Sequence, residues 1–206
     1  DSNNAPIGSA ILQPGKYDGG QLIDRIATLS EFVPIEFLGG EGCKIGQAVA
    51  GVGSFFAKLI GSRTRLQAIS ARQASNRVDA AIALPVGKGM VKNEILEIGK
   101  ITGWAGAALG TKVKKSGRTT GITNGEITQT SVTVNVQYGE GKIAVFTNQL
   151  MIEPGGFSGG GDSGSVVLDE VNRLVALLFA GSEDCTIVTP IELVFAELGV
   201  ELYLGA

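Results

Sequence analysis

A glycine-rich segment around Ser163 contains the residue types that nucleophilic catalysis requires. The segment reads Gly-Gly-Gly-Asp-Ser-Gly-Ser and spans residues 159–165. Glycines on both sides of a serine let the backbone turn sharply, expose the hydroxyl and direct backbone N–H groups into one concavity. Such N–H groups stabilise the oxyanion of an acyl-transfer reaction by roughly 3–4 kcal/mol per donor. On these residues alone, a plain glycine loop with an Asx turn at Asp162 is an equally good interpretation.

A series of short β-type runs surrounds this segment and predicts the elements that would position it. The runs are separated by glycine turn signals and lie at 78–84, 94–103, 111–116, 124–137, 142–152, 164–169, 173–180 and 184–190. Short strands at near-regular spacing predict a β-barrel or a β-sandwich. After them, apolar residues at helical spacing between Pro190 and Gly199 predict a closing helix.

The first part of the chain has a weaker pattern. Residues 1–21 are rich in proline and glycine turn signals, and the apolar residues at 22–37 predict at least one strand. Residues 44–60 place apolar side chains at i, i+3, i+4 and i+7, which predicts a helix. Each glycine inside that run costs such a helix about 1 kcal/mol relative to alanine.

The composition indicates a folded domain and argues against two kinds of partner. The 206 residues are 44% hydrophobic and 18% charged, so the chain can bury a core and is not intrinsically disordered. The net charge is −3 and no block of basic residues occurs, which argues against nucleic acid. No apolar stretch reaches the ~18 residues of a membrane-spanning helix, so we expect no membrane partner.

Four motifs occur in the order found in chymotrypsin-like (trypsin-like) serine peptidases, and they resemble the bacterial branch of streptogrisin and α-lytic type. Residues 161–165 resemble the nucleophile motif, and residues 115–125 resemble the "SG-x-TTG" hairpin of that branch. Residues 153–155, Glu-Pro-Gly, precede the serine as in "EPGDSGG", although extra residues are inserted here. Residues 179–185 resemble "TSGGSGNC". The resemblance covers about residues 77–200.

The resemblance implies an all-β, chymotrypsin-like double β-barrel. We expect an incomplete first barrel with a helical insertion near 44–60, and a second barrel that ends in the C-terminal helix. The implied domains are residues 1–104, the remnant of the first barrel, and residues 105–206, which carry the nucleophile loop. The alternative fold is an unrelated β-sandwich in which the Gly-Asp-Ser-Gly-Ser sequence is a chance loop.

The resemblance also implies catalytic roles for named residues. Ser163 would be the nucleophile, the backbone N–H groups of Gly161 and Ser163 would form the oxyanion hole, and Asp79 would orient the base. Asp79 lies in residues 76–83, which are similar to the "D-x-A" strand start of the family; its ordinary alternative is to cap a strand or turn. Asp162 would hold the loop shape through buried hydrogen bonds, or would be an exposed turn carboxylate.

The substrate-binding residues follow from the same resemblance. Phe179, Ala180 and Gly181 would pair with an extended substrate backbone by strand addition, and Gly181 would leave the specificity pocket open. Phe157 and Ser158 lie where the pocket floor begins. Because neither is a carboxylate, preference for arginine or lysine is not supported, and we expect a small or apolar substrate side chain. Ordinary core packing is an equally good interpretation of Phe157.

The chain contains no histidine, although the family places one before the aspartate in chain order. A serine without a base is a poor nucleophile, so this chain alone is expected to be inactive. The histidine could lie on a segment before Asp1, removed by truncation or self-processing; the chain could have lost catalysis; or a lysine could replace the histidine. We favour the first explanation, because residues 1–4 resemble the loop that follows the histidine in the family.

The resulting hypothesis is a serine endopeptidase with a Ser-His-Asp acyl-enzyme mechanism and no metal or cofactor. Its expected partners are a peptide or protein substrate and its own His-bearing N-terminal fragment. The alternative is a catalytically inactive peptidase fold that serves as a peptide-binding or scaffold module. Cys185 matches a family cysteine whose partner position is filled here by residues 157–159, and unpaired Cys43 and Cys185 weakly favour an intracellular location.

Overall fold

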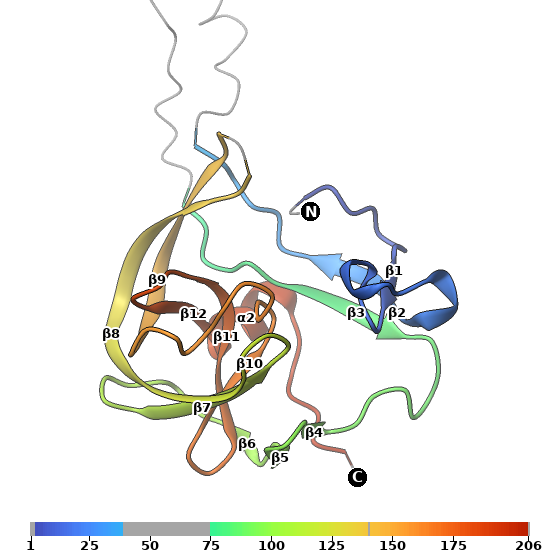
Figure 1. The fold of residues 1–206 in the computed structure, drawn as a ribbon. Helices are drawn as coiled ribbons and strands as arrows, with labels where there is room; N and C mark the ends of the chain where they lie inside the picture. The colour runs from blue at the N-terminus through green and yellow to red at the C-terminus, as the bar shows by residue number, and fades with distance from the viewer. Residues whose placement is uncertain (1–2, 39–74, 140, 206) are drawn as a thin grey trace, which may run out of the picture.

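The computed structural model describes residues 3–38, 75–139 and 141–205 (Figure 1). In this part of the chain, six antiparallel strands pair in a closed ring, in the order β7 (Lys112–Gly117), β8 (Gly121–Gln137), β9 (Ile143–Glu153), β12 (Thr186–Pro190), β11 (Arg173–Gly181) and β10 (Val166–Asp169). β10 pairs with β11 on one side and with β7 on the other, which closes the barrel. Closure removes most of the free strand edge of an open sheet, although β11 runs on to Gly181, beyond its pairing with β10 at Leu177. The predicted second barrel is therefore confirmed.

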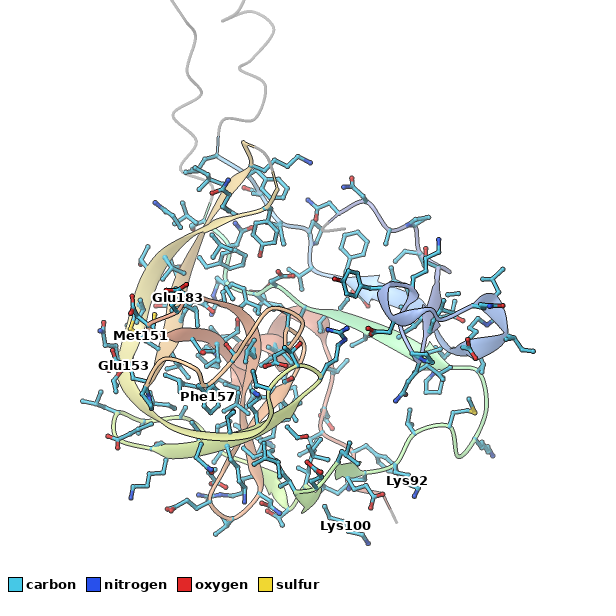
Figure 2. The ribbon with its side chains drawn as sticks, in the orientation of Figure 1. Lys92, Lys100, Met151, Glu153, Phe157 and Glu183 are labelled. Atoms are coloured by element: carbon cyan, nitrogen blue, oxygen red, sulfur yellow. The ribbon has the colours of Figure 1, made fainter. Side chains whose placement is uncertain are left out.

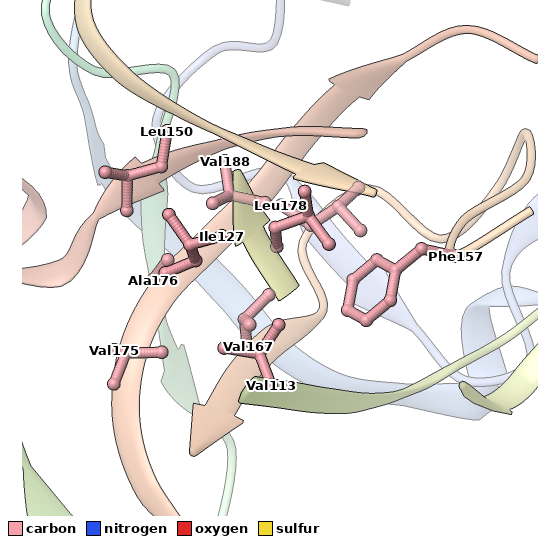
Figure 3. Close-up of a cluster of buried hydrophobic side chains, with 10 residues drawn as sticks. Val113, Ile127, Leu150, Phe157, Val167, Val175, Ala176, Leu178 and Val188 are labelled. Carbon is pink, nitrogen blue, oxygen red and sulfur yellow. The ribbon is translucent and has the colours of Figure 1, made fainter. Parts of the chain in front are cut away.

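The interior of this barrel is filled by apolar side chains, which alternate with less buried ones along β7 and β8, whereas β10, β11 and β12 are buried at successive positions. Alternation arises because successive residues of a strand point to opposite faces of the sheet. The buried cluster contains Val113, Ile127, Leu150, Ile152, Phe157, Val167, Val175, Ala176, Leu178 and Val188 (Figure 3). Burial of each larger side chain contributes about 1.5–3 kcal/mol. This core fixes the two loops, at 154–165 and 182–185, that carry the site described below.

The predicted C-terminal helix is also confirmed. Helix α2 (Ile191–Leu198) starts after Pro190 and ends at Gly199, whose φ of 60° is left-handed and whose N–H donates to the carbonyl of Phe195. A proline at the start and a glycine at the end are the usual sequence signals for these positions. The apolar face of α2 covers the outside of the barrel and contacts the segment that leads into β3, through Val78, Ala80, Leu168, Leu174, Ile191, Val194 and Leu198.

Beside the barrel lies a smaller antiparallel sheet, formed by β1 (Ala10–Leu12), β2 (Arg25–Phe32) and β3 (Ala81–Pro85) (Figure 1). Two short 3-10 helices, η1 (Lys16–Asp18) and η2 (Leu22–Asp24), connect β1 to β2. In the described residues this sheet stays open and does not close into a barrel. Leu84 of β3 is 69% exposed, which leaves apolar surface on the strand uncovered.

The connection between the two sheets differs from the sequence prediction. The run at 94–103 is not one strand: β4 (Glu94–Ile95) and β5 (Gly99–Lys100) form a tight hairpin, and β6 (Gly103–Trp104) pairs in parallel with the start of β11. The chain reverses because Glu97 and Gly99 both adopt positive φ angles, 64° and 99°. The predicted helix at 44–60 lies outside the described residues, as does Cys43. Among the helices that are described, none is long and apolar enough to cross a membrane.

Candidate active site

Ser163 lies on a tight loop between β9 and β10, and its side chain is exposed. Its hydroxyl donates a hydrogen bond to the carbonyl of Phe179 on β11, at 3.3 Å. The loop is tied to the same strand by two backbone hydrogen bonds, from Gly164 N–H to Leu178 and from Leu178 N–H to Ser165. Gly161 and Gly164 adopt φ angles of 102° and 88°, which only glycine adopts without strain. The loop is therefore held in one conformation that presents a serine hydroxyl to solvent.

Asp162, the residue before the serine, is buried and holds the loop from inside. Its carboxylate accepts hydrogen bonds from the backbone N–H of Thr119 at 2.7 Å, from the N–H of Gly159 at 3.0 Å and from the hydroxyl of Thr120 at 2.6 Å. Burial by itself would raise the pKa of Asp162, but these hydrogen bonds outweigh it and hold the pKa far below its ordinary value. Asp162 therefore remains ionised and hydrogen-bonded, not an exposed turn carboxylate.

Lys115 of β7 supplies the opposite charge. Its Nζ lies 3.2 Å from Oδ2 of Asp162, and both side chains are fully buried. The same ammonium donates to the carbonyl of Gly121 at 3.1 Å and to the hydroxyl of Thr120. All of its donors are thus directed at acceptors other than Ser163. This arrangement leaves Lys115 without the role of base that a Ser–Lys enzyme would require, and it makes the lysine a support of the nucleophile loop.

The backbone N–H groups expected to form the oxyanion hole are available. Within the described part of the chain, neither Gly161 nor Ser163 donates its N–H to another residue. The Gly161 Cα lies against the β7–β8 turn: a Cβ there would come within 2.8 Å of the Arg118 guanidinium. Arg118 is itself paired with Asp18 of η1 and lies 5.5 Å from the ring of Tyr17. The small sheet and the nucleophile loop are therefore linked through Arg118.

A cavity of about 510 Å³ opens beside the serine. It is formed by the nucleophile loop, β11 and the β11–β12 turn, and its lining residues are Ser158, Gly159, Gly160, Ser163, Leu178, Ala180, Gly181, Ser182 and Glu183. A Cβ at Gly181 would lie 3.2 Å from the Ser158 hydroxyl, so any larger residue at 181 would reduce the cavity. Three of the substrate-binding residues predicted from the sequence, Ser158, Ala180 and Gly181, therefore meet at one cavity.

Phe157 and Phe179, also predicted to bind substrate, have other surroundings. Phe157 is 1% exposed and packs in the barrel core, so its ordinary packing interpretation describes it and the pocket-floor prediction does not (Figure 3). Its ring belongs to the same buried cluster as Ile152 and Val188, while Ser158, the next residue, lines the cavity. Phe179 touches the site only through its carbonyl, and its ring packs on Phe146 at 4.7 Å.

Asp79 lies away from this cavity. It is half-buried at the end of the segment that leads into β3, and its Oδ2 accepts a hydrogen bond of 2.6 Å from the hydroxyl of Tyr138. Burial, and then the contact with the Asp79 carboxylate, raise the pKa of Tyr138, so the phenol keeps its proton. Asp79 lines a separate cavity of about 280 Å³ together with Leu29, Phe32 and other residues of the small sheet.

The Asp79 carboxylate and the Ser163 hydroxyl do not contact each other, but a series of aromatic side chains lies between them. Tyr138 lies 6.3 Å from Phe146, and Phe146 contacts Phe179, whose carbonyl receives the Ser163 hydroxyl. The sequence motifs did not reveal Tyr138, Leu178, Ser182 or Glu183 as site residues. Of these, only Ser182 and Glu183 fall inside a recognised motif, residues 179–185. In the described residues, no group of three or more His, Cys, Asp and Glu side chains could hold a metal ion.

Comparison with known proteins identifies the class of fold. No family model matches the chain. Protease A of Thermobifida fusca is similar at 25% identity and a TM-score of 0.50, over 62% of this chain and 69% of that one. The chymotrypsin of Cellulomonas bogoriensis is similar at 24% identity and a TM-score of 0.49, over 62% and 70% of the two chains. The chain has the fold of the chymotrypsin-like serine peptidases.

A curated relative places the resemblance more closely. Glutamyl endopeptidase 2 of Streptomyces griseus is 34% identical over 111 residues, which are 50% of this chain and 54% of that protein. The chain thus spans about half the length of the curated relative that it matches. The resemblance to bacterial chymotrypsin-like serine peptidases, predicted from the four motifs, is confirmed, and the similar proteins are endopeptidases.

Proposed function

We propose that this chain carries the nucleophile of a serine endopeptidase that cleaves peptide bonds through an acyl-enzyme. The observation that carries the proposal is the exposed Ser163 hydroxyl on a loop fixed by a buried Asp162–Lys115 pair, at the edge of a 510 Å³ cavity. Burying the two ions costs several kcal/mol each, a cost that their pairing offsets only in part, and we infer that the pair is kept because it fixes the loop around Ser163.

The proposed reaction has two steps. The Oγ of Ser163 attacks the scissile carbonyl carbon while a base takes its proton, and the carbonyl oxygen becomes an oxyanion held by the N–H groups of Gly161 and Ser163. The peptide C–N bond then breaks, and the base returns the proton to the leaving amine. Water, deprotonated by the same base, attacks the acyl-enzyme ester and releases the acid and the free Ser163 hydroxyl.

We infer that the base comes from another polypeptide segment, since the sequence has no histidine and Lys115, which supports the nucleophile loop, is engaged. We infer that a His-bearing segment, the chain's own N-terminal fragment, docks at the small sheet beside Asp79. The Asp79 cavity of about 280 Å³ offers room, and the carboxylate uses only Oδ2 for Tyr138 among the described residues. Its other oxygen is free to accept an imidazole N–H, and the exposed apolar surface of β3 around Leu84 would be covered.

The substrate backbone is placed along β11 in this proposal. β11 pairs with β12 at Ala180 and Gly181, and no described strand pairs with those residues on their other side. An extended peptide can therefore add there as a further strand, with one side chain entering the cavity. The same edge supports the second candidate function, an inactive peptide-binding module. The observation that favours that candidate is the Ser163 hydroxyl, which donates to a carbonyl instead of to a base.

Reaction with a neutral fluorophosphonate, followed by intact-mass analysis, tests the proposal. We expect slow single labelling of the chain, which added imidazole accelerates and which Ser163→Ala abolishes. Imidazole is small enough to enter beside Asp79, so Asp79→Asn should reduce the acceleration of labelling by imidazole. A hindered base such as 2,6-lutidine should accelerate labelling little, both in the wild-type chain and in Asp79→Asn. Labelling that is absent with imidazole, in a chain that still binds peptides, would favour the binding module instead.

A further inference from the structure

The cavity beside Ser163 has an unequal distribution of charge. Among its lining residues Glu183 alone carries a charged side chain, and the others are apolar, glycine or serine. Neither Phe157 nor Ser158, the two residues predicted from the sequence to begin the pocket floor, is a carboxylate. Glu183 reaches the cavity from the β11–β12 turn instead. The structure therefore changes what side chain the cavity can accept.

The turn that carries Glu183 is held in place. The Ser182 N–H donates to the Cys185 carbonyl at 2.8 Å, and the Ser182 hydroxyl accepts from the N–H groups of Asp184 and Cys185 at 3.3 Å each. The Glu183 carbonyl also packs so closely on Gly155 that a Cβ at that glycine would lie 2.1 Å from it. Glu183 is thus presented at the cavity by a fixed backbone, although its side chain is exposed.

No cation in the described residues offsets this carboxylate at the cavity. Arg118 contacts the nucleophile loop at Gly161, but it does not line the cavity and its guanidinium is paired with Asp18. Lys115 is buried and paired with Asp162. Figure 2 shows Lys92 and Lys100 at the lower edge of the molecule, well away from Glu183. An acidic side chain in the cavity would lose water and meet only a like charge.

We propose that the cavity selects a lysine or arginine side chain and rejects an acidic one, with Glu183 as the specificity-determining residue. This inference rests on the proposed function, since it assigns the substrate class of the same site. Leu178 and Ala180 would pack against the methylene groups of the substrate side chain, and Ser158, Ser182 and Glu183 would face its charged end. The preference is opposite to the one that the name of glutamyl endopeptidase 2 states for that protein.

Binding of three small probes to the full chain tests this proposal without requiring catalysis. The probes are n-butylammonium, butyrate and n-butanol, which share a stem and differ in charge, and amide chemical shifts in a ¹⁵N NMR spectrum report the site. We expect the ammonium to shift the amides of residues 158–160 and 180–183 and butyrate to leave them unchanged. Glu183→Gln should weaken ammonium binding about two- to fivefold, the size of an exposed ion pair.

Glu170→Gln is the matched control, because Glu170 is also an exposed glutamate but lies at the opposite end of β11 from Glu183. It should leave the binding of all three probes unchanged. Equal binding of butyrate and butylammonium, an unchanged affinity in Glu183→Gln, or no binding of any probe would each overturn the proposal. Fluorophosphonate labelling of Ser163 is independent of these readouts. If the cavity preferred butylammonium but Ser163 were not labelled, the proposed peptidase function would be refuted and the proposed preference for a cationic side chain would not.

Discussion

Replacing Lys115 by methionine should destabilise the fold by about 3–5 kcal/mol and abolish the reactivity of Ser163. The substitution keeps the length and apolar stem of the side chain and removes its charge. It leaves the Asp162 carboxylate buried and ionised without its partner at 3.2 Å, a loss that typically costs 3–5 kcal/mol. The hydrogen bonds from Gly159, Thr119 and Thr120 remain, so we expect the lower end of that range.

Urea unfolding and fluorophosphonate labelling measure the two consequences separately. Lys114→Met is the matched control, because the neighbouring side chain points away from the core and reaches only the Glu170 carbonyl, at 3.4 Å. Its cost should stay below about 1 kcal/mol, as for most surface substitutions. The double variant Lys115→Met/Asp162→Leu should recover part of the lost stability, because no unpaired buried charge remains, but should not recover labelling, because the loop has lost its internal hydrogen bonds.

The reasoning would be refuted by a Lys115→Met protein that is as stable as Lys114→Met and labels at the wild-type rate. The Asp162 charge would then be satisfied by its hydrogen bonds alone, and the ion pair would not support the loop. If stability fell but labelling persisted, the pair would contribute to folding and not to the position of Ser163.

Three further outcomes follow from the site. Asp162 has a folded-state pKa below its ordinary value of 3.8, so it adds stability that is fully present above that pH and is lost as the pH falls through the folded-state pKa; acid unfolding monitored by circular dichroism should therefore begin below about pH 4 and move to higher pH in Lys115→Met. Gly181→Val should block the cavity and prevent binding of the butylammonium probe in an NMR titration of the folded protein, because even the Cβ of a residue at 181 would lie 3.2 Å from both the Ser158 hydroxyl and the Cys185 carbonyl. Phe157→Ala should cost about 3–5 kcal/mol in urea unfolding, as a truncated core aromatic does, and probe selectivity by charge should persist in the folded fraction.

The β-strands and the closing helix were predictable because their signals are local. The run of β8 alternates over enough residues to define a strand, and β9, β11 and β12 are β-rich runs bounded by turn residues. The proline and glycine around α2 mark its ends within the sequence itself. The prediction of one β run over residues 94–103 was wrong, because the apolar pattern does not encode the positive φ angles that turn the segment into a hairpin.

The nucleophile loop was also predictable, because Gly161 and Gly164 permit the positive φ angles that a tight turn around Ser163 requires. The sequence could not decide between core and pocket for Phe157, since the same ring suits either place and only barrel closure determines which way it points.

Only the tertiary structure determined which residues far apart in the chain come into contact. Tyr138 and Asp79 are separated by 59 residues, Arg118 and Asp18 by 100, and no periodicity or spacing predicts that either pair will meet. Glu183 became a cavity residue only because the β11–β12 turn folds against the loop at Gly155. Sequence pattern determines elements because their backbone geometry repeats over a few residues. Charge and shape at the site depend on where the closed barrel brings those elements together.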